Sequence, residues 1–198
     1  MSNIKKYTET NFVRIAGRVE EELKVCYKYN GEKFYETIIT VPRKNSEIED
    51  HISVILSKKM RRRNIKKDDK VYLRGEIRKY RIPDDNGEFV AKTGIFVFEI
   101  KFINKINFIN EVILEGNIVE KPYYKEIDNK KFTTLILDIP RKYNHSDYLS
   151  VFAVDERAEK LKDMQINQKI KIEGKFQSRE VPSKGMIFCE VFIKRYKI

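Results

Sequence analysis

The chain contains an internal duplication, which limits its fold more than any other feature of the sequence. Residues 11–19 and 110–118 share the pattern N-x-V-x-(I/L)-x-G-x-(V/I). Four further blocks recur in the same order, namely residues 41–44 with 139–142, 52–54 with 149–151, 71–75 with 170–174, and 94–102 with 185–193. Chance is a poor explanation for so many ordered matches, so the sequence predicts two copies of one module. We place them at residues 1–104 and 105–198.

The spacing between matching blocks shows where the two copies differ in length. Between Gly75 and Gly94 the first copy is eight residues longer than the second copy is between Gly174 and Gly185. Proline, aspartate, asparagine and glycine gather at residues 82–88 of this segment, which favours a longer hairpin loop. The join between the copies is short and is not rich in Gly or Ser, so we expect the copies to hold a fixed relation.

Strands are expected to dominate both copies. Apolar residues recur at period two, and the more apolar set should face the core. This set comprises Thr37, Ile39 and Val41 in the first copy and Leu135, Leu137 and Ile139 in the second. The dipeptides Asn30-Gly31 and Asp128-Asn129 lie between apolar and aromatic runs. Such dipeptides predict tight hairpin turns.

One stretch in each copy has helical character, at residues 56–64 and 155–164. Each copy should therefore have about five strands with a short helix after the third. Glycines inside the strands suit the sharp bends and close approaches of a barrel. This order describes an OB-fold, a five-stranded Greek-key barrel with one helix. The predicted fold class is all-β, with two tandem OB-folds; a pair of other small barrels or sandwiches is the alternative.

With these residues the chain resembles the bacterial single-stranded DNA-binding protein family. The first strand of that family is similar to residues 11–17 and 110–116. Its third strand is similar to the runs that end in Val41-Pro42-Arg43 and Ile139-Pro140-Arg141. Lys160-Leu161 followed by residues 170–174 is similar to its helix and fourth strand. The resemblance implies non-catalytic binding of single-stranded DNA in replication, repair or recombination. The tandem arrangement resembles members in which a homodimer supplies four barrels.

Three departures from the family pattern affect this interpretation. The chain has no tryptophan, whereas family members usually stack bases on tryptophans. It stops at residues 195–198 without an acidic-apolar tail, and the strand before each helix has Ile52 or Leu149 where an aromatic residue is usual. These departures favour an accessory, mobile-element or primosome-type relative. In the alternative interpretation, the barrels of such a protein mainly bind other proteins.

Sequence-tolerant binding of a strand needs aromatic faces for bases and cations for phosphates. Both gather around the predicted hairpin between the second and third apolar runs of each copy. The candidate stacking residues are Tyr27, Tyr29, Phe34 and Tyr35 in the first copy and Tyr123, Tyr124 and Phe132 in the second. Phe34 and Phe132 occupy matching positions and, at period two, face away from the core. The alternative is that these rings close a barrel end or a subunit interface.

Basic side chains on the strands and in one charged run are the candidate phosphate contacts. They are Arg14, Arg18, Arg43, Lys44, Arg61, Arg62, Arg63, Arg74 and Arg78 in the first copy and Arg141, Lys142, Lys171 and Lys175 in the second. The run at residues 58–67 is strongly basic, whereas residues 155–160 are mixed in sign. Up to residue 104 there are 23 basic and 16 acidic residues, against 18 and 14 afterwards. We therefore expect the first copy to bind more strongly; solvated side chains are the alternative.

The net charge of +11 favours a polyanionic partner, with RNA as an alternative to DNA. His51 and His145 are the only histidines available for acid–base catalysis, and no catalytic or zinc-binding motif occurs. Glu99 and Glu190 recur singly and are expected to pair with Arg or Lys. We expect no enzyme activity, cofactor or metal. Two distant cysteines, no long apolar run and no apolar signal region predict a cytoplasmic protein without a membrane span.

Overall fold

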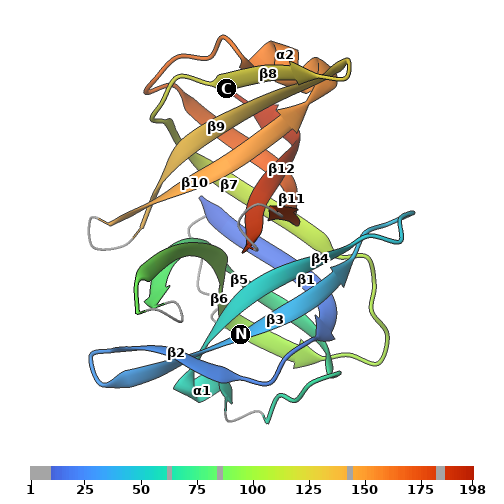
Figure 1. The fold of residues 1–198 in the computed structure, drawn as a ribbon, viewed down its shortest axis with the longest axis vertical. Helices are drawn as coiled ribbons and strands as arrows, with labels where there is room; N and C mark the ends of the chain where they lie inside the picture. Colours follow the sequence, from blue (N-terminus) through green and yellow to red (C-terminus); the bar gives the residue numbers. More distant parts are fainter. Residues whose placement is uncertain (1–9, 62–63, 84–86, 142–144, 182–185) are drawn as a thin grey trace, which may run out of the picture. The chain divides into compact units, whose positions relative to one another are not determined.

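The computed structural model describes residues 10–61, 64–83, 87–141, 145–181 and 186–198, which form strands and two short helices (Figure 1). The chain divides into two compact units. The first-repeat unit comprises Val13–Glu111 and Phe176–Glu190, and the second-repeat unit comprises Met1–Phe12, Val112–Lys175 and Val191–Ile198. Neither unit is continuous in sequence, and the domain ranges 1–104 and 105–198 stay a prediction.

The first repeat forms a closed barrel of five strands. Its elements are β1 (Asn11–Val19), β2 (Lys24–Tyr29), β3 (Glu32–Pro42), β4 (Glu49–Ser57), α1 (Lys58–Arg61), β5 (Lys70–Pro83) and β6 (Phe89–Phe102). The ring runs β1-β3-β4-β6-β5 and returns to β1. The β4–β6 pair is parallel and the other pairs are antiparallel. This is the predicted OB-fold order, with α1 after the third strand of the ring.

The second repeat forms the same ring. Its elements are β7 (Asn110–Ile118), β8 (Tyr123–Ile127), β9 (Lys130–Pro140), β10 (Ser146–Val154), α2 (Asp155–Leu161), β11 (Lys169–Val181) and β12 (Met186–Lys197). The ring runs β7-β9-β10-β12-β11 and returns to β7, with β10 and β12 parallel. The predicted all-β class with two OB-folds is therefore confirmed.

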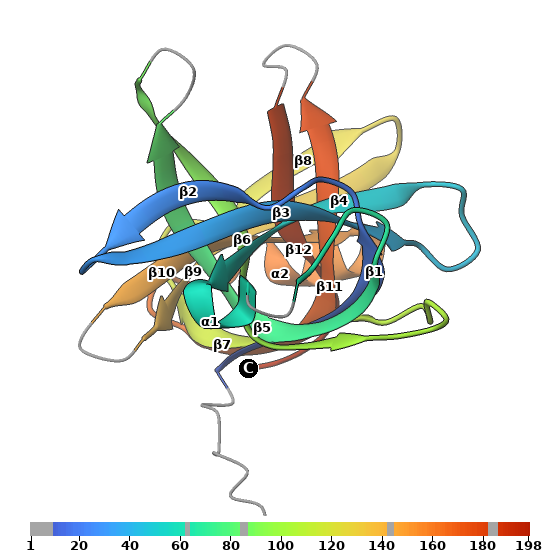
Figure 2. The same ribbon diagram turned by 90° about the horizontal axis from the view of Figure 1, so that it is seen from below.

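A sixth strand in each repeat lies outside the ring. Among the described strands, β2 pairs only with β3, and β8 pairs only with β9. Figures 1 and 2 show β2 and the start of β3 as a two-stranded arm that extends beyond the barrel. Both arms turn through the predicted dipeptides, since Asn30, Gly31, Asp128 and Asn129 all have positive φ. Two consecutive residues of this kind form the hairpin turn that matches the twist of the strands.

The buried residues confirm the predicted strand faces. Thr37, Ile39 and Val41 are at most 2% exposed, and so are their counterparts in β9. Gly17 and Gly116 lie where β1 and β7 cross β3 and β9. A Cβ at either glycine would collide with the carbonyl oxygen of Thr40 or Asp138, so these strands can close the barrel only without a side chain there.

The helices differ in how well they match their prediction. The first is shorter than expected at residues 56–64, because Leu56 and Ser57 are the last residues of β4 and pair with β3. The second begins at Asp155 as expected, ends at Leu161 rather than at residue 164, and buries Ala158 and Leu161. Neither described helix is long and apolar enough to cross a membrane.

Candidate nucleic-acid interface

A stacked aromatic pair occupies the β2–β3 arm of the first repeat. Lys24 and Val25 pair with Glu36 and Tyr35, and a β-bulge then makes Tyr27 the direct partner of Phe34. Direct partners in an antiparallel pair share one face. The rings of Tyr27 and Phe34 stack with centroids 4.8 Å apart and an angle of 11° between their planes. Both rings are half-buried on the face opposite the core, as predicted for Phe34.

Other predicted aromatic residues of this arm have different surroundings. Tyr29 is 66% exposed near the tip of the arm, whereas Tyr35 is only 4% exposed. The ring of Tyr35 belongs to the core, because its parity is that of Thr37 and Ile39. We therefore leave Tyr35 out of the proposed interface.

Polar contacts connect the strand that carries Phe34 to the β5–β6 hairpin. Glu36 follows Phe34 on the same face of β3 and accepts a hydrogen bond from Tyr80 OH at 2.7 Å. Ser53 and Lys92 also contact this carboxylate. Burial and the nearby Glu36 charge raise the pKa of Tyr80, so its hydroxyl remains a donor.

Arginines lie over phenylalanine rings on the outer side of β5 and β6. The Tyr80 and Phe96 rings meet edge to face at 5.8 Å. The Arg78 guanidinium lies 4.9 Å from the Phe96 centroid, and that of Arg74 lies 5.9 Å from the Phe98 centroid. The outer face of the first barrel thus carries rings and cations from the β2–β3 arm to the β5–β6 hairpin. Phe96 and Phe98 were not among the predicted stacking residues. Their alternation with the buried Ile95 and Val97 could have predicted that they face outward.

The arm of the second repeat has no bulge, and this changes the partner of the matching phenylalanine. Lys125 pairs with Phe132, and its Nζ lies 5.8 Å from the ring centroid. Tyr123 shares this face and is 64% exposed. Tyr124 has the opposite parity and points to the side on which α2 lies, where its hydroxyl donates to Glu159 at 3.1 Å.

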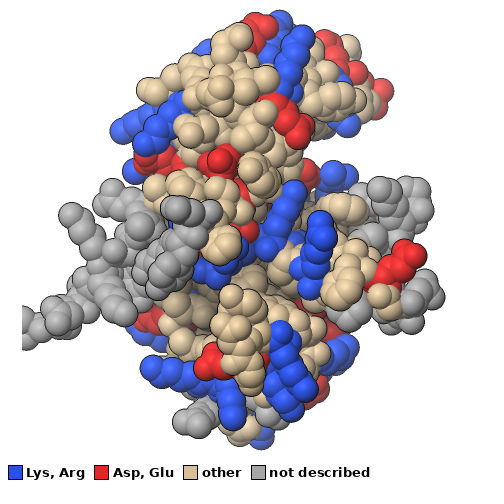
Figure 3. Space-filling view, turned by 90° about the vertical axis from the view of Figure 1, so that its left-hand side faces the viewer, with Lys and Arg blue, Asp and Glu red and all other residues tan. Residues whose placement is uncertain are grey.

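Most of the predicted phosphate contacts take part in ion pairs. In the first-repeat unit, the pairs are Arg14 with Glu111, Arg18 with Asp68, Arg43 with Asp50, Arg74 with Glu99, and Arg78 with Glu76. In the second-repeat unit, they are Arg141 with Asp147 and Lys171 with Glu115. Basic and acidic side chains are correspondingly interspersed on the face drawn in Figure 3. The surface potential is therefore weaker than the count of arginines suggests.

The remaining predicted cations divide by what the structure describes. Lys44 is exposed and Lys175 is half-buried. The side chains of Arg61, Arg62 and Arg63 lie outside the described residues, and so does Lys142. Their role as phosphate contacts stays a prediction.

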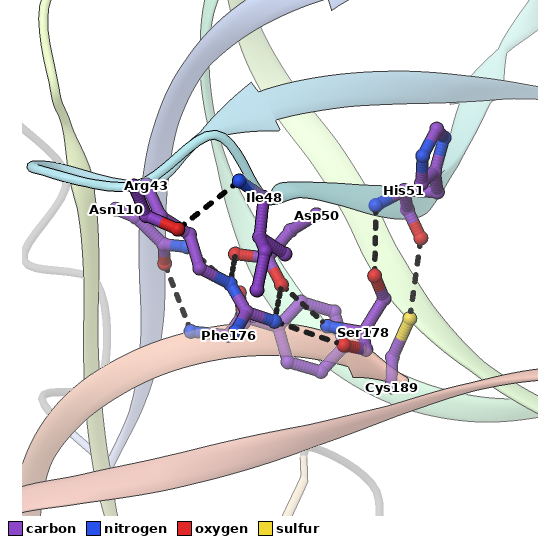
Figure 4. Close-up of polar contacts among 9 residues, drawn as sticks. Arg43, Ile48, Asp50, His51, Asn110, Phe176, Ser178 and Cys189 are labelled. Carbon is purple, nitrogen blue, oxygen red and sulfur yellow. Dashed lines mark hydrogen bonds and ion pairs between the residues drawn. The ribbon is translucent and has the colours of Figure 1, made fainter. Parts of the chain in front are cut away.

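Arg43 belongs to a buried polar cluster (Figure 4). Two of its nitrogens donate to Asp50, at 2.6 and 3.1 Å, and one also donates to the carbonyl oxygen of Ser178. Asp50 is fully buried and accepts a further bond from the Ser178 N–H at 2.8 Å. The Ser178 hydroxyl accepts from the His51 N–H at 2.9 Å. These bonds indicate that Arg43 stabilises the unit. The sequence offered no sign of the contact with Ser178, because the two residues are 135 positions apart.

The described residues contain little that favours catalysis. Burial raises the pKa of Cys26 to about 11 and that of Cys189 to about 12, which keeps both thiols protonated at neutral pH. No described group of three His, Cys, Asp or Glu residues could hold a metal ion. Glu99 pairs with Arg74 and Lys101, and Glu190 pairs with Arg179. The structural role predicted for these glutamates is confirmed.

Comparison with known proteins identifies the fold. No protein-family model and no curated protein matches this sequence. The wild-type single-stranded DNA binding protein from Thermus aquaticus matches with a TM-score of 0.75 and 16% identity, over 94% of this chain and 91% of that chain. A deletion mutant of that protein matches with a TM-score of 0.74 and 16% identity, over 94% of this chain and 93% of that chain. At the level of fold, the predicted resemblance is confirmed.

Proposed function

We propose that this chain binds single-stranded DNA without sequence preference and without catalysis. The observation that carries the proposal is the outer face of the first barrel, where a stacked aromatic pair lies on one arm and arginines cover phenylalanine rings on the next hairpin. Bases stack on such rings whatever their sequence, and cations track the phosphates. The likeness of fold to a single-stranded DNA binding protein supports the same ligand.

We propose a separate set of stacking rings on each repeat. Tyr27, Tyr29 and Phe34 lie on the first arm and Tyr123 and Phe132 on the second. Arg74 and Arg78 supply cations on the first barrel, and Phe96 and Phe98 extend the stacking surface. Arg74 and Arg78 each pair with a glutamate as well, but their guanidinium groups lie over rings of the proposed surface. The other predicted basic residues contribute through the general field of the protein.

The test is a fluorescence-anisotropy titration with oligo-dT, a matched RNA and a duplex, at several salt concentrations. Single-stranded DNA is expected to bind at least about tenfold more tightly than the duplex, because stacking requires unpaired bases. Equal affinity for all three would leave only non-specific attraction. That result would favour a primosome-type or mobile-element accessory protein whose barrels bind other proteins. Tighter binding of RNA would redirect the proposal to an RNA ligand.

We further propose a homodimer that acts in the cytoplasm in DNA replication, repair or recombination. Two barrels in each chain would then provide four in the assembly. The β2 and β8 arms offer a physical route, because each pairs on one side only and an unpaired strand edge can bind a second chain. Light scattering that gives a monomer at tens of micromolar would contradict the dimer.

A further inference from the structure

Three hydrogen-bond donors meet on one carboxylate in the second-repeat unit. Glu159 in α2 accepts from Lys131 Nζ at 2.8 Å and from Tyr124 OH at 3.1 Å, and its other oxygen pairs with Lys162. The Lys162 ammonium also lies 5.3 Å from the centre of the Tyr124 ring. Cations that bind phosphates and aromatic faces that stack bases are also what a single-stranded nucleic acid requires of its binding surface.

The register of the β8–β9 arm explains why these groups meet. Tyr124 pairs with Thr133, which is buried and donates to the carbonyl oxygen of Ala158 in α2. Lys131 has the same parity as Thr133. Tyr124 and Lys131 therefore face the side of the arm that α2 covers. Glu159 follows Ala158 in α2, which places its carboxylate near both side chains.

The matching sequence positions of the first repeat have a different charge. Lys33 matches Lys131 across the repeat and is exposed on the β2–β3 arm. Because α1 and α2 begin at matching positions, Arg62 takes the place of Glu159 in the sequence. A lysine and an arginine thus stand in the first copy where the second copy has a lysine and a glutamate.

We infer that Glu159 acts as a built-in substitute for a phosphate, which holds Lys131 and Lys162 and thereby weakens the binding of single-stranded DNA by the second repeat. The inference rests on the proposed function. It makes Glu159 a positioning residue that sets the unequal affinities of the two barrels. A phosphate of single-stranded DNA that reaches this arm has to displace the Glu159 carboxylate before it can pair with either lysine.

The ionisation of Glu159 agrees with this role. Hydrogen bonds from Lys131, the largest cause, and from Lys162 lower the pKa of Glu159 to about 2. The carboxylate therefore stays charged at any physiological pH. The side chains involved are all more than 30% exposed. Exposed ion pairs contribute only modestly to folding, so variants of Glu159 should remain folded.

The experiment compares Glu159→Gln with Glu156→Gln in the full chain. Both variants gain one unit of charge on the same helix, but Glu156 pairs only with Lys160 among the described ion pairs. Glutamine keeps an oxygen that can accept from Tyr124. Binding of oligo-dT is measured by anisotropy over a series of salt concentrations, and thermal unfolding checks that each variant is folded.

Glu159→Gln is expected to bind more tightly at low salt and to steepen the salt dependence by up to about 1.4, which is ~0.7 for each of two new phosphate contacts. Glu156→Gln should keep the wild-type slope. Adding Lys131→Gln and Lys162→Gln to Glu159→Gln should remove the gain. Equal slopes for the two single variants, with normal wild-type binding, would overturn this inference alone. No binding of oligo-dT by the wild-type chain would overturn the proposed function as well.

Discussion

The substitution Phe34→Ala tests whether bases stack on the first arm. Tyr27 covers one face of the Phe34 ring at a centroid distance of 4.8 Å, so at most one base can stack on Phe34. One such stack contributes ~1–3 kcal/mol, which corresponds to an increase in Kd of about fivefold to 150-fold. Because no charge is removed, the salt dependence of binding should be almost unchanged.

The same substitution has a separate and smaller effect on stability. Phe34 is half-buried on the outer face of β3, and its loss removes an aromatic pair that contributes about 0.5–1.5 kcal/mol. The variant should therefore stay folded, unlike Ile39→Ala in the core, which is expected to cost about 2–5 kcal/mol.

The assay is anisotropy with oligo-dT at several salt concentrations, combined with urea unfolding. Ile38→Ala is the matched control, because Ile38 lies on the same strand, has the same outward parity and is also half-buried, but has no aromatic ring. Phe132→Ala should weaken binding in the same direction through the second arm. If Phe34→Ala binds normally, weakens binding only as much as Ile38→Ala, or unfolds, then the stacking argument is wrong.

Three further predictions concern stability. Asp50→Asn should lower the free energy of unfolding in urea by about 3 kcal/mol, at the lower end of the range for breaking a buried ion pair, because the Arg43 side chain is 26% exposed. A decrease below about 1 kcal/mol would contradict a structural role. Gly17→Ala should also lower the free energy of unfolding by about 3 kcal/mol. Gly31→Ala, with no atom near the new Cβ, should lower it by about 1 kcal/mol. Equal decreases would exclude a collision between the new Cβ at residue 17 and the Thr40 carbonyl oxygen. The Glu159 ion pairs stabilise the fold above the ordinary carboxyl pKa of 4.5, and this stabilisation is lost as pH falls towards the lowered pKa of about 2. The difference in Tm between wild type and Glu159→Gln should therefore shrink over that range. A constant difference in Tm would contradict the lowered pKa.

Local patterns account for most of what could be predicted. Period two identifies the inward residues of β3 and β9, because consecutive side chains of any strand point to opposite faces. Asn30-Gly31 predicts its turn because both residues accept positive φ. The repeat doubles this information, since a pattern that occurs twice in order is seldom accidental. The family resemblance then supplied the choice of DNA, which the residues alone do not make.

Contacts between distant segments account for what could not be predicted. The sequence shows an excess of arginine, but Arg14 meets Glu111 and Arg43 meets Ser178 only because the folded chain brings those segments together. An ion pair between distant segments changes the availability of a cation without leaving any local trace in the sequence. The candidate phosphate contacts were therefore chosen by parity, without knowledge of their partners.

The faces of the strands and the turns of the arms could be predicted from the sequence, because these features depend on residues within a few positions of one another. The tertiary structure decided which rings and charges share a surface. A single bulge makes Tyr27, rather than its neighbour, the partner of Phe34, and the packing of α2 against β9 sets Glu159 against Lys131. Both outcomes depend on register and packing between segments, and a shift of one residue in register reverses the face that a side chain occupies.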